Sequence, residues 1–381
     1  MTGSLQIKHG KYYAVLNFRE NGKRKQKWIS TGISEKGSKR IANQKLREIL
    51  NEYETNPLMY NSNILFSDYF KKWLKEAKMK VDTVTYQHYE NDTYNHIIPY
   101  FEILKIRLID VDRQALQKYF NSKFENGRLD GKGGLSAKTL RHHKNIIFQT
   151  LHLAVLNELI PNNPCENVTL PKRERYNYQF YNIEELHTFF NAVKEEELYP
   201  LYLVTATYGL RRSEVLGIKW DSIDIDNKRL TIKHTRTRAN EIIEKDKTKN
   251  QASFRSFPLT DEITNIFVRL KLREKENKKL FGKEYNNNDY VFKWDNGKPY
   301  NPDYITDKFS NTLVKYALKR IRFHDLRHSC ASLLNSQGFT LKDIQEWLGH
   351  ADIQTTANTY SHLDIKRKKC IADCLTTVLN K

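Results

Sequence analysis

Cysteine is scarce in this chain of 381 residues, which has four: Cys165, Cys330, Cys370 and Cys374. Four cysteines at such uneven spacing do not form the disulfide framework of a small secreted protein. Long hydrophobic runs are also missing. No apolar stretch approaches the roughly 18 residues that a membrane-spanning helix needs, and the opening MTGSLQIKHG lacks the hydrophobic segment of a secretory signal. These absences predict a soluble, reduced, cytoplasmic protein.

Acidic residues are in the minority. There are 45 Asp and Glu against 64 Lys and Arg, so the formal net charge is +19 and the pI is about 9.5. Such a surplus is typical of proteins that bind a polyanion, because each phosphate neutralised by Lys or Arg releases counterions. The basic residues are spread along the whole chain, whereas a membrane-surface protein gathers them on one amphipathic helix. We therefore expect a multidomain protein that binds nucleic acid.

The first 34 residues predict a small basic β unit. Residues 12–18 follow a period-2 pattern, in which Tyr12, Ala14, Leu16 and Phe18 alternate with Tyr13, Val15 and Asn17. Asn21-Gly22 is a strong hairpin signal because both turn positions need positive φ. Residues 1–34 contain seven Lys or Arg and one acid. A basic sheet suits a DNA groove; the alternative is a basic surface hairpin without a specific partner. The candidate DNA contacts are Arg19, Lys23, Lys25 and Lys27.

Helical patterns follow in two blocks, at about 36–54 and from 64 to 170. The apolar side of the first helix is expected to carry Ile41, Leu46, Ile49 and Leu50. In the second block Ser136 caps a helix to about Glu158, and Lys138 and Arg141 lie near its start. Basic residues there suit phosphate contact, and a solvated face over an apolar core is the alternative.

Three motifs stand out beyond residue 181, where helices surround hairpin signals at 223–260. They are GLRRSE at 209–214, HDLRH at 324–328 and LGH at 348–350. Each motif alone could be an ordinary feature, such as solvated arginines on a helix surface or a histidine at a helix end. The combination is not ordinary, because Tyr360 follows ten residues after the last motif.

Local patterns place the side chains of these motifs. Gly209 breaks one helix, so Arg211 falls at the start of the next, where backbone amides favour an anion. Apolar residues recur at helical spacing around the second motif: Phe323, Leu326, Cys330 and Leu333. That stripe predicts His324 and Arg327 together on the opposite side of the helix. Gly349 is expected to end a helix that Thr340 opens with a capping box.

A zinc site is the rival interpretation of the second motif. His324 and His328 have the spacing of an HExxH zinc helix, and Glu346 could supply a third ligand. However, the acid between the histidines is Asp325, and Arg327 would bring a cation close to the metal. We therefore expect no metal ion.

Taken together, the order R…K…HxxR…H…Y resembles the tyrosine recombinase, or phage integrase, family over the whole chain. The resemblance implies a multidomain α+β fold. Residues 1–57 would be an arm-type DNA-binding domain, a small three-stranded sheet plus helix. Residues 64–170 would be an all-α, SAM-like core-binding domain. Residues 175–381 would be a mixed, mainly α catalytic domain with a small β-hairpin sheet and a tail helix at 364–381. Integrases of temperate phages and of integrative conjugative elements are the most similar members.

The resemblance also implies a phosphate-binding group. Arg211 and Arg327 would bind the nonbridging oxygens of the scissile phosphate, and His350 would donate a hydrogen bond to it. The planar guanidinium matches a phosphate in two-pronged contacts and stays protonated. We expect Glu214 to orient Arg211 or its helix.

The remaining catalytic roles fall to three residues. Tyr360 would attack the phosphorus and form a 3′-phosphotyrosyl bond, and His324 would accept or orient its proton. Lys247, in the pattern KTK…R…PL, would protonate the departing 5′-oxygen. Lys245 and Lys249 are close enough to leave the choice of lysine open.

The implied activity is integration and excision of a mobile element through a Holliday junction, without metal, ATP or other cofactor. Four subunits would assemble on double-stranded DNA, in a prokaryotic cytoplasm at the nucleoid, with an excisionase and a host DNA-bending protein as possible partners. The tail helix could pack in its own protomer or on a neighbour. Two alternatives stay open: a type IB topoisomerase, and a non-catalytic DNA-binding protein on a recombinase scaffold.

Overall fold

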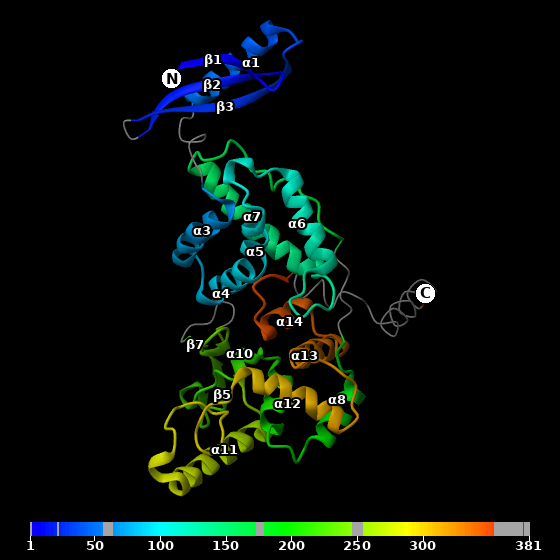
Figure 1. The fold of residues 1–381 in the computed structure, drawn as a ribbon. Helices are drawn as coiled ribbons and strands as arrows, with labels where there is room; N and C mark the ends of the chain where they lie inside the picture. The colour runs from blue at the N-terminus through cyan, green and yellow to red at the C-terminus, as the bar shows by residue number, and fades with distance from the viewer. Residues whose placement is uncertain are drawn as a thin grey trace. The chain divides into compact units, whose positions relative to one another are not determined.

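The computed structural model describes residues 2–20, 23–55, 64–172, 179–245, 254–353 and 376, without the side chains of residues 18–20, 23–25, 27 and 52–55. The chain divides into two compact units, Met1–Arg175 and Tyr176–Lys381 (Figure 1). Sheets and helices occur in both units, which confirms the expected α+β class. Within the described ranges, no helix is long and apolar enough to cross a membrane.

The chain begins with an antiparallel sheet in the order β1-β2-β3, with a helix packed on one face. The elements are β1 (Thr2–Lys8), β2 (Lys11–Glu20), β3 (Lys23–Ser34) and α1 (Lys39–Thr55). Glu20 pairs with Lys23, so two residues connect β2 to β3, although the Asn21-Gly22 turn itself lies outside the described residues. The expected three-stranded sheet with one helix is confirmed.

Small and aliphatic side chains join α1 to the sheet. Ala14 of β2 is buried in one cluster with Leu46 and Ile49 of the helix. Ala42 is also fully buried, whereas Ile41 is 57% exposed. The expectation for Ile41 was wrong because the buried stripe runs through Ala42, Leu46 and Ile49. Those positions are four and three residues apart, and Ile41 lies off that face.

The rest of the first unit is helical. Its elements are α3 (Phe66–Lys80), α4 (Thr83–Asp92), a π-helical turn η1 (Thr93–Ile97), α5 (Ile98–Leu104), a 3-10 turn η2 (Leu108–Asp110), α6 (Arg113–Asn126) and α7 (Ala137–Leu156). Aromatic rings fill the core between them, with Phe66 4.7 Å from Phe70 and 4.8 Å from Phe101 between ring centroids. The hydroxyl of Ser136 accepts the backbone N–H of Thr139 and caps α7, as predicted.

The second unit surrounds two small sheets with helices. The helical elements are α8 (Ile183–Ala192), α9 (Tyr199–Tyr208), α10 (Arg212–Val215), η3 (Trp220–Ser222), α11 (Asp261–Phe281), η5 (Gly282–Glu284), α12 (Pro302–Lys315), α13 (Asp325–Ser336) and α14 (Leu341–Leu348). The strands are β4 (Ile223–Asp224), β5 (Arg229–Ile232), β6 (Thr235–Arg238), β7 (Ile242–Lys245) and β8 (Arg255–Pro258). They form the sheets β4-β5-β8 and β6-β7, all within the stretch where hairpins were expected.

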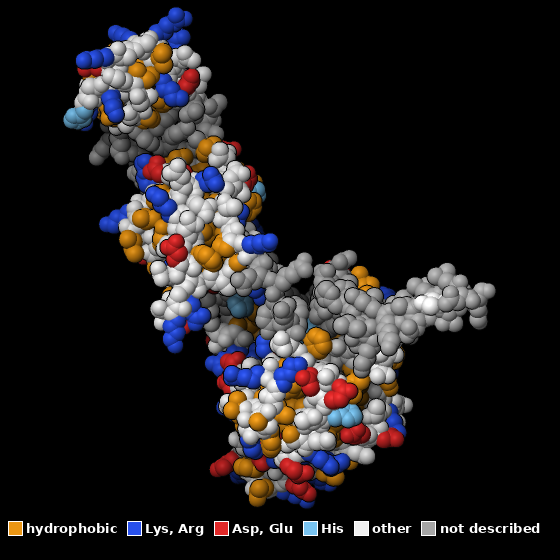
Figure 2. Space-filling view, turned by 90° about the vertical axis from the view of Figure 1, so that its right-hand side faces the viewer, with side chains coloured by type: hydrophobic (Ala, Val, Ile, Leu, Met, Phe, Trp, Pro, Cys, Tyr) orange, Lys and Arg blue, Asp and Glu red, His pale blue; other side chains and the backbone are white. Residues whose placement is uncertain are grey.

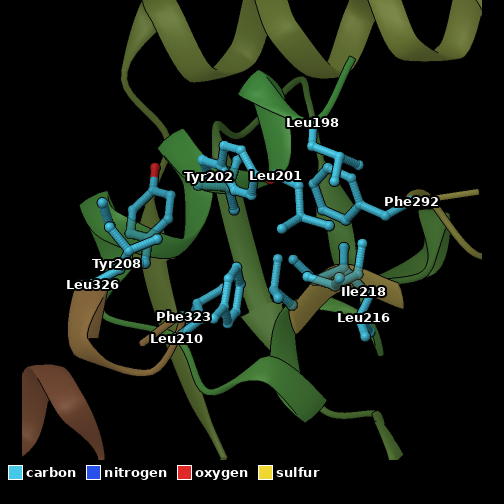
Figure 3. Packing of buried hydrophobic residues seen from close by; sticks show 14 of the residues in the cluster. Leu198, Leu201, Tyr202, Tyr208, Leu210, Leu216, Ile218, Phe292, Phe323 and Leu326 are labelled. Carbon is cyan, nitrogen blue, oxygen red and sulfur yellow. The ribbon is translucent and has the colours of Figure 1, made fainter. Parts of the chain in front are cut away.

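A large hydrophobic core fills the described part of this unit, and part of it is drawn in Figure 3. Tyr202 and Tyr208 of α9 are buried in it with Phe323 and Leu326. α9 and α13 lie against each other, so the end of α9 meets the beginning of α13. Two of the three motifs therefore come together, although more than 100 residues separate them in the sequence.

Candidate active site

A tight turn after α9 joins the first two motifs. Gly209 ends α9 in the left-handed conformation, with φ +58°. Its carbonyl oxygen accepts a hydrogen bond of 2.6 Å from Nη1 of Arg327. A Cβ at Gly209 would lie 2.5 Å from Cδ2 of Leu348 and 3.3 Å from Sγ of Cys330. The turn therefore requires glycine for its backbone angle and for the space around it.

Arg327 is buried although it lies in a motif of polar residues. Arg327 is 1% exposed, and Leu326 and Cys330 on the same helix are also buried. The sequence pattern placed Arg327 opposite the apolar stripe but gave no indication that its side chain is buried. α13 is covered by α9 on one side and by α14 on another, so more than one face of the helix is enclosed. His324, at the N-cap of α13, is the exposed member of the pair.

A buried carboxylate, Glu214, lies between the arginines. Oε1 of Glu214 accepts Nη1 of Arg211 at 2.5 Å, and Oε2 accepts the backbone N–H of Arg211 at 2.9 Å. Arg255 donates two hydrogen bonds to the same carboxylate, at 3.0 and 3.3 Å. Nη1 of Arg327 is 3.9 Å from Oε2. We call Arg211, Glu214, Arg255 and Arg327 the arginine–glutamate network.

Glu214 is ionised throughout the physiological pH range. Its side chain is 2% exposed, and burial by itself would raise its pKa. The charge and hydrogen bonds of Arg255, followed by the charges of Arg211 and Arg327, outweigh burial and lower the pKa of Glu214 to about 2. Glu214 therefore orients Arg211, in agreement with the expectation from the sequence.

The third motif reaches the same place through the end of α14. Thr340 and Asp343 form the predicted capping box, and Gly349 ends the helix with φ +67°. The carbonyl oxygen of Gly349 accepts Nη2 of Arg211 at 3.2 Å. His350 follows directly. Burial, and then the charges of Arg327 and Arg211, lower its pKa to about 3. His350 is therefore a neutral hydrogen-bonding group close to the two cations.

His324 is also neutral at physiological pH. Desolvation by the surrounding protein, followed by the charges of His328 and Arg327, lowers the pKa of His324 to about 4. Its side chain is nevertheless accessible to solvent. The ring centroids of His324 and His328 are 5.2 Å apart, with the planes at 86°. The turn that carries His324 is held by Asp325, which accepts the backbone N–H of Arg322 at 2.8 Å. An accessible neutral imidazole can accept a proton.

Arg255 was not predicted as part of the site, because the sequence places it only in a hairpin pattern. Arg255 and Phe257 lie on the same face of β8, and the guanidinium carbon is 5.2 Å from the centroid of the Phe257 ring. The side chain of Arg255 is 8% exposed. An arginine two residues before a buried phenylalanine in a strand signals an inward-pointing cation, which requires a buried acid.

Two sequence-predicted catalytic residues belong to stretches that the structure does not describe. Lys247 and the alternative Lys249 lie in residues 246–253, and Tyr360 lies in residues 354–375, all outside the described residues. Lys245, the third lysine considered, ends β7, where it pairs with Thr235. The expected tail helix at 364–381 likewise falls outside the description, apart from residue 376.

The predicted DNA contacts lie on strands β2 and β3 and on helix α7. Arg19 belongs to β2, and Lys23, Lys25 and Lys27 belong to β3, but their side chains are not described. Lys138 and Arg141 are exposed on the first turns of α7. In Figure 2, Lys and Arg side chains are scattered over the visible face of the described regions, with acidic side chains among them. This distribution agrees with the even spread of basic residues in the sequence.

The zinc interpretation finds no support in the described ranges. No group of three His, Cys, Asp or Glu side chains there could hold a metal ion. Glu346, the proposed third ligand, is 68% exposed and pairs with Lys342 at 3.3 Å.

Comparisons with known proteins match this chain to one family. The model of the phage integrase family matches residues 179–367, and the model of the phage integrase N-terminal SAM-like domain matches residues 65–124. The chain is 27% identical over 389 residues to a XerC-like tyrosine recombinase of Caldanaerobacter subterraneus subsp. tengcongensis, with 95% of each chain covered.

Solved structures show the same fold. The Tn1549 transposon integrase in complex with a circular intermediate DNA matches with a TM-score of 0.64 at 18% identity, over 82% of this chain and 99% of that chain. A lambda integrase tetramer bound to a Holliday junction matches with a TM-score of 0.57 at 15% identity, over 94% of this chain and 97% of that chain.

Proposed function

The chain belongs to the phage integrase family, the tyrosine recombinases, and we propose that it recombines double-stranded DNA through a covalent 3′-phosphotyrosyl intermediate. One observation carries the proposal. Arg211 and Arg327, from two separate motifs, meet at the buried carboxylate of Glu214. Arg211 also donates a hydrogen bond to Gly349, the residue before His350 in the third motif.

The charges at this place suit a phosphodiester. Three arginines and one glutamate of the arginine–glutamate network leave a net charge of +2 (3 − 1), in surroundings where burial strengthens electrostatic interactions. The negative charge of Glu214 offsets the repulsion between the three arginines when no DNA is bound. The planar guanidinium groups of Arg211 and Arg327 then bind the nonbridging oxygens and stabilise the charge that grows as the phosphorus becomes five-coordinate.

The proton transfers follow from the neutral histidines. In cleavage, the oxygen of Tyr360 forms a bond to phosphorus while the bond from phosphorus to the 5′-oxygen breaks. His324, with a pKa of about 4, takes the phenolic proton, and Lys247 gives a proton to the departing oxygen. Rejoining is the same sequence in reverse, with a 5′-hydroxyl as nucleophile. His350 donates a hydrogen bond to a phosphate oxygen.

The biological substrate is inferred from the relatives. The solved neighbours are a transposon integrase on a circular intermediate DNA and a lambda integrase tetramer on a Holliday junction. We infer that this chain integrates and excises a mobile element, and that four copies assemble on the DNA. An excisionase and a host DNA-bending protein belong to the same inference.

The division of labour between domains is part of the proposal. Residues 1–57 would hold arm-type sites through the basic strands β2 and β3. Residues 64–170, with Lys138 and Arg141 exposed on α7, would hold the core site together with the catalytic domain at 175–381. The separate hydrophobic clusters of the sheet and of the helices support a boundary between the first two domains.

A recombination assay tests the proposed function. Substrates are taken from DNA that flanks the gene of this protein, where the ends of an element lie, and the products are recombinant molecules and Holliday junctions. The wild type should form both. Arg211→Ala and Arg327→Ala should lower cleavage at least about 100-fold while keeping most DNA affinity. Arg273→Gln, which removes a half-exposed arginine paired with Asp295, is the matched control.

The alternatives predict other results. A topoisomerase would relax supercoiled plasmid without exchanging partners, and a non-catalytic binding protein would hold the sites without cutting either strand. Either result with the wild type, on substrates that contain the true junctions, would remove the recombinase proposal.

A further inference from the structure

Arg255 has no chemical step in the proposed reaction, yet its side chain is almost entirely buried at the edge of the site. It is 8% exposed and packs over the ring of Phe257. Its guanidinium nitrogens donate hydrogen bonds to protein groups, the Glu214 carboxylate and the carbonyl oxygen of Trp347. Its role must therefore be sought in the protein groups that it contacts.

The guanidinium of Arg255 joins two elements that each hold part of the phosphate-binding group. Two of its nitrogens donate to the carboxylate of Glu214 on α10, at 3.0 and 3.3 Å. Its Nε donates to the carbonyl oxygen of Trp347 on α14, at 3.0 Å. Trp347 lies in the last turn of α14, where a carbonyl has no partner within the helix and a cation is favoured by the helix dipole.

The contacts of Arg255 close a ring with those of Arg211. Glu214 binds Arg211 at 2.5 Å, and Arg211 donates to the carbonyl oxygen of Gly349, two residues after Trp347. The ring thus links β8, α10 and the end of α14, which lie 41 to 138 residues apart in the sequence.

We propose that Arg255 is a positioning residue that fixes Arg211 and His350 against the same phosphate. It does so by holding Glu214 from one side and the last turn of α14 from the other. The inference rests on the proposed function and adds a residue to it. Lysine cannot replace this arginine, because one ammonium group cannot span a carboxylate and a carbonyl in the geometry of the planar fork.

The test compares Arg255→Gln and Arg255→Lys with wild type in the full-length protein, on a nicked substrate that traps the covalent complex. Loss of an outer-shell group that orients a metal ligand lowers activity about 10- to 100-fold, and we take this as the scale for a group that orients an arginine. We expect both variants to cleave 10- to 100-fold more slowly, with DNA affinity within about twofold of wild type. Arg273→Gln is again the control, because it removes a guanidinium from an ion pair away from the network.

Two modified substrates separate positioning from general damage. A methylphosphonate at the scissile position replaces one charged oxygen by a methyl group and so reduces the need for a well-placed guanidinium. The difference between Arg255→Gln and wild type should shrink on this substrate. A sulfur in place of the 5′-bridging oxygen removes the need for a general acid, and it should leave the difference unchanged.

A double-mutant cycle asks whether Arg255 acts through Arg211. Combining Arg255→Gln with Arg211→Lys should slow cleavage little more than Arg211→Lys alone, because the two changes disturb the same contact. Thermal unfolding of every variant is measured in parallel. If Arg255→Gln does not fold, Arg255→Lys takes its place in the cycle.

Three results would overturn the inference. They are wild-type cleavage by both Arg255 variants, an equal defect on the methylphosphonate and the ordinary phosphate, and fully additive effects in the cycle. A wild-type protein that forms no covalent complex on any substrate would instead overturn the proposed function.

Discussion

The carbonyl oxygen of Gly209 accepts a hydrogen bond of 2.6 Å from the guanidinium of Arg327, across 118 positions of the chain. Gly209 also lies two residues before Arg211, so one turn sets the positions of both arginines. The proposed phosphate-binding group therefore depends on backbone geometry as well as on its charged side chains.

Replacing Gly209 tests that dependence. Gly209→Ala puts a side chain on a residue with φ +58° and brings its Cβ to 2.5 Å from Leu348. Left-handed strain and overpacking together should lower the free energy of unfolding by about 2–5 kcal/mol, measured by chemical denaturation. Gly338 has φ +90° with no atom within 4 Å of a new Cβ. Gly338→Ala should therefore lower the free energy of unfolding through backbone strain alone, by about 1–2 kcal/mol. Equal losses would show that the packing at Gly209 is unimportant.

Neutralising Glu214 should destabilise the fold. Glu214→Gln leaves three arginines without their common countercharge, and breaking a buried ion pair costs about 3–5 kcal/mol. Its low pKa adds a pH signature. Glu214 contributes stability that is complete above pH 4.5 and is lost as the pH falls toward 2, so the variant should lack this part of the acid dependence. The exposed Glu346→Gln is the control and should change stability by less than about 0.5 kcal/mol. Unchanged stability of Glu214→Gln would contradict the role given to the carboxylate.

The histidines predict a loss of stability in weak acid. The pKa values of His324, His328 and His350 are lowered from 6.5 to about 4, 4 and 3. Between those values and pH 6.5 the unfolded chain binds more protons than the folded one, so the melting temperature should be constant above 6.5 and should fall below it. His350→Gln should make that fall less steep, whereas the exposed His142→Gln should not. A melting temperature that does not change between pH 6.5 and 4 would count against histidines that are held neutral in the folded protein.

The exposed cations of α7 are expected to contact DNA phosphates. Lys138→Ala and Arg141→Ala should weaken binding to all duplexes alike, and each should reduce the salt dependence of the binding constant by about one charge. The melting temperature should not change, because both side chains are exposed. Lys80→Ala, which removes an exposed lysine on α3, is the comparison. Equal effects at all three positions would show a general charge effect and no defined contact surface.

Local signals in the sequence were sufficient for local structure. Ser136 and Thr340 cap their helices and Gly349 ends one, because each feature depends on a few neighbouring residues. The burial of Arg327 and the role of Arg255 were not predictable in this way. Both depend on packing partners, α9 and Glu214, that are distant in the sequence, and no periodic pattern in one element encodes them.

The motif residues form an intermediate case. The sequence identified Arg211, Arg327 and His350 by their resemblance to a family, and the structure brings them together. The pairing of Arg211 with Glu214, three residues later, follows from helix geometry and was expected. The second arginine on that carboxylate was not expected, because β8 reaches α10 only in the folded unit.

The formation of a covalent adduct tests the central claim most directly. DNA from the flanks of the gene is labelled and nicked beside the candidate junction, so that the short fragment with the 5′-hydroxyl is lost and the complex is trapped. It is incubated in EDTA with wild type and with Tyr360→Phe, and SDS-resistant complexes are counted. We predict an adduct with the wild type only, and equal DNA binding by the two proteins. An adduct with Tyr360→Phe, or none with the wild type on the true junction, would contradict the account.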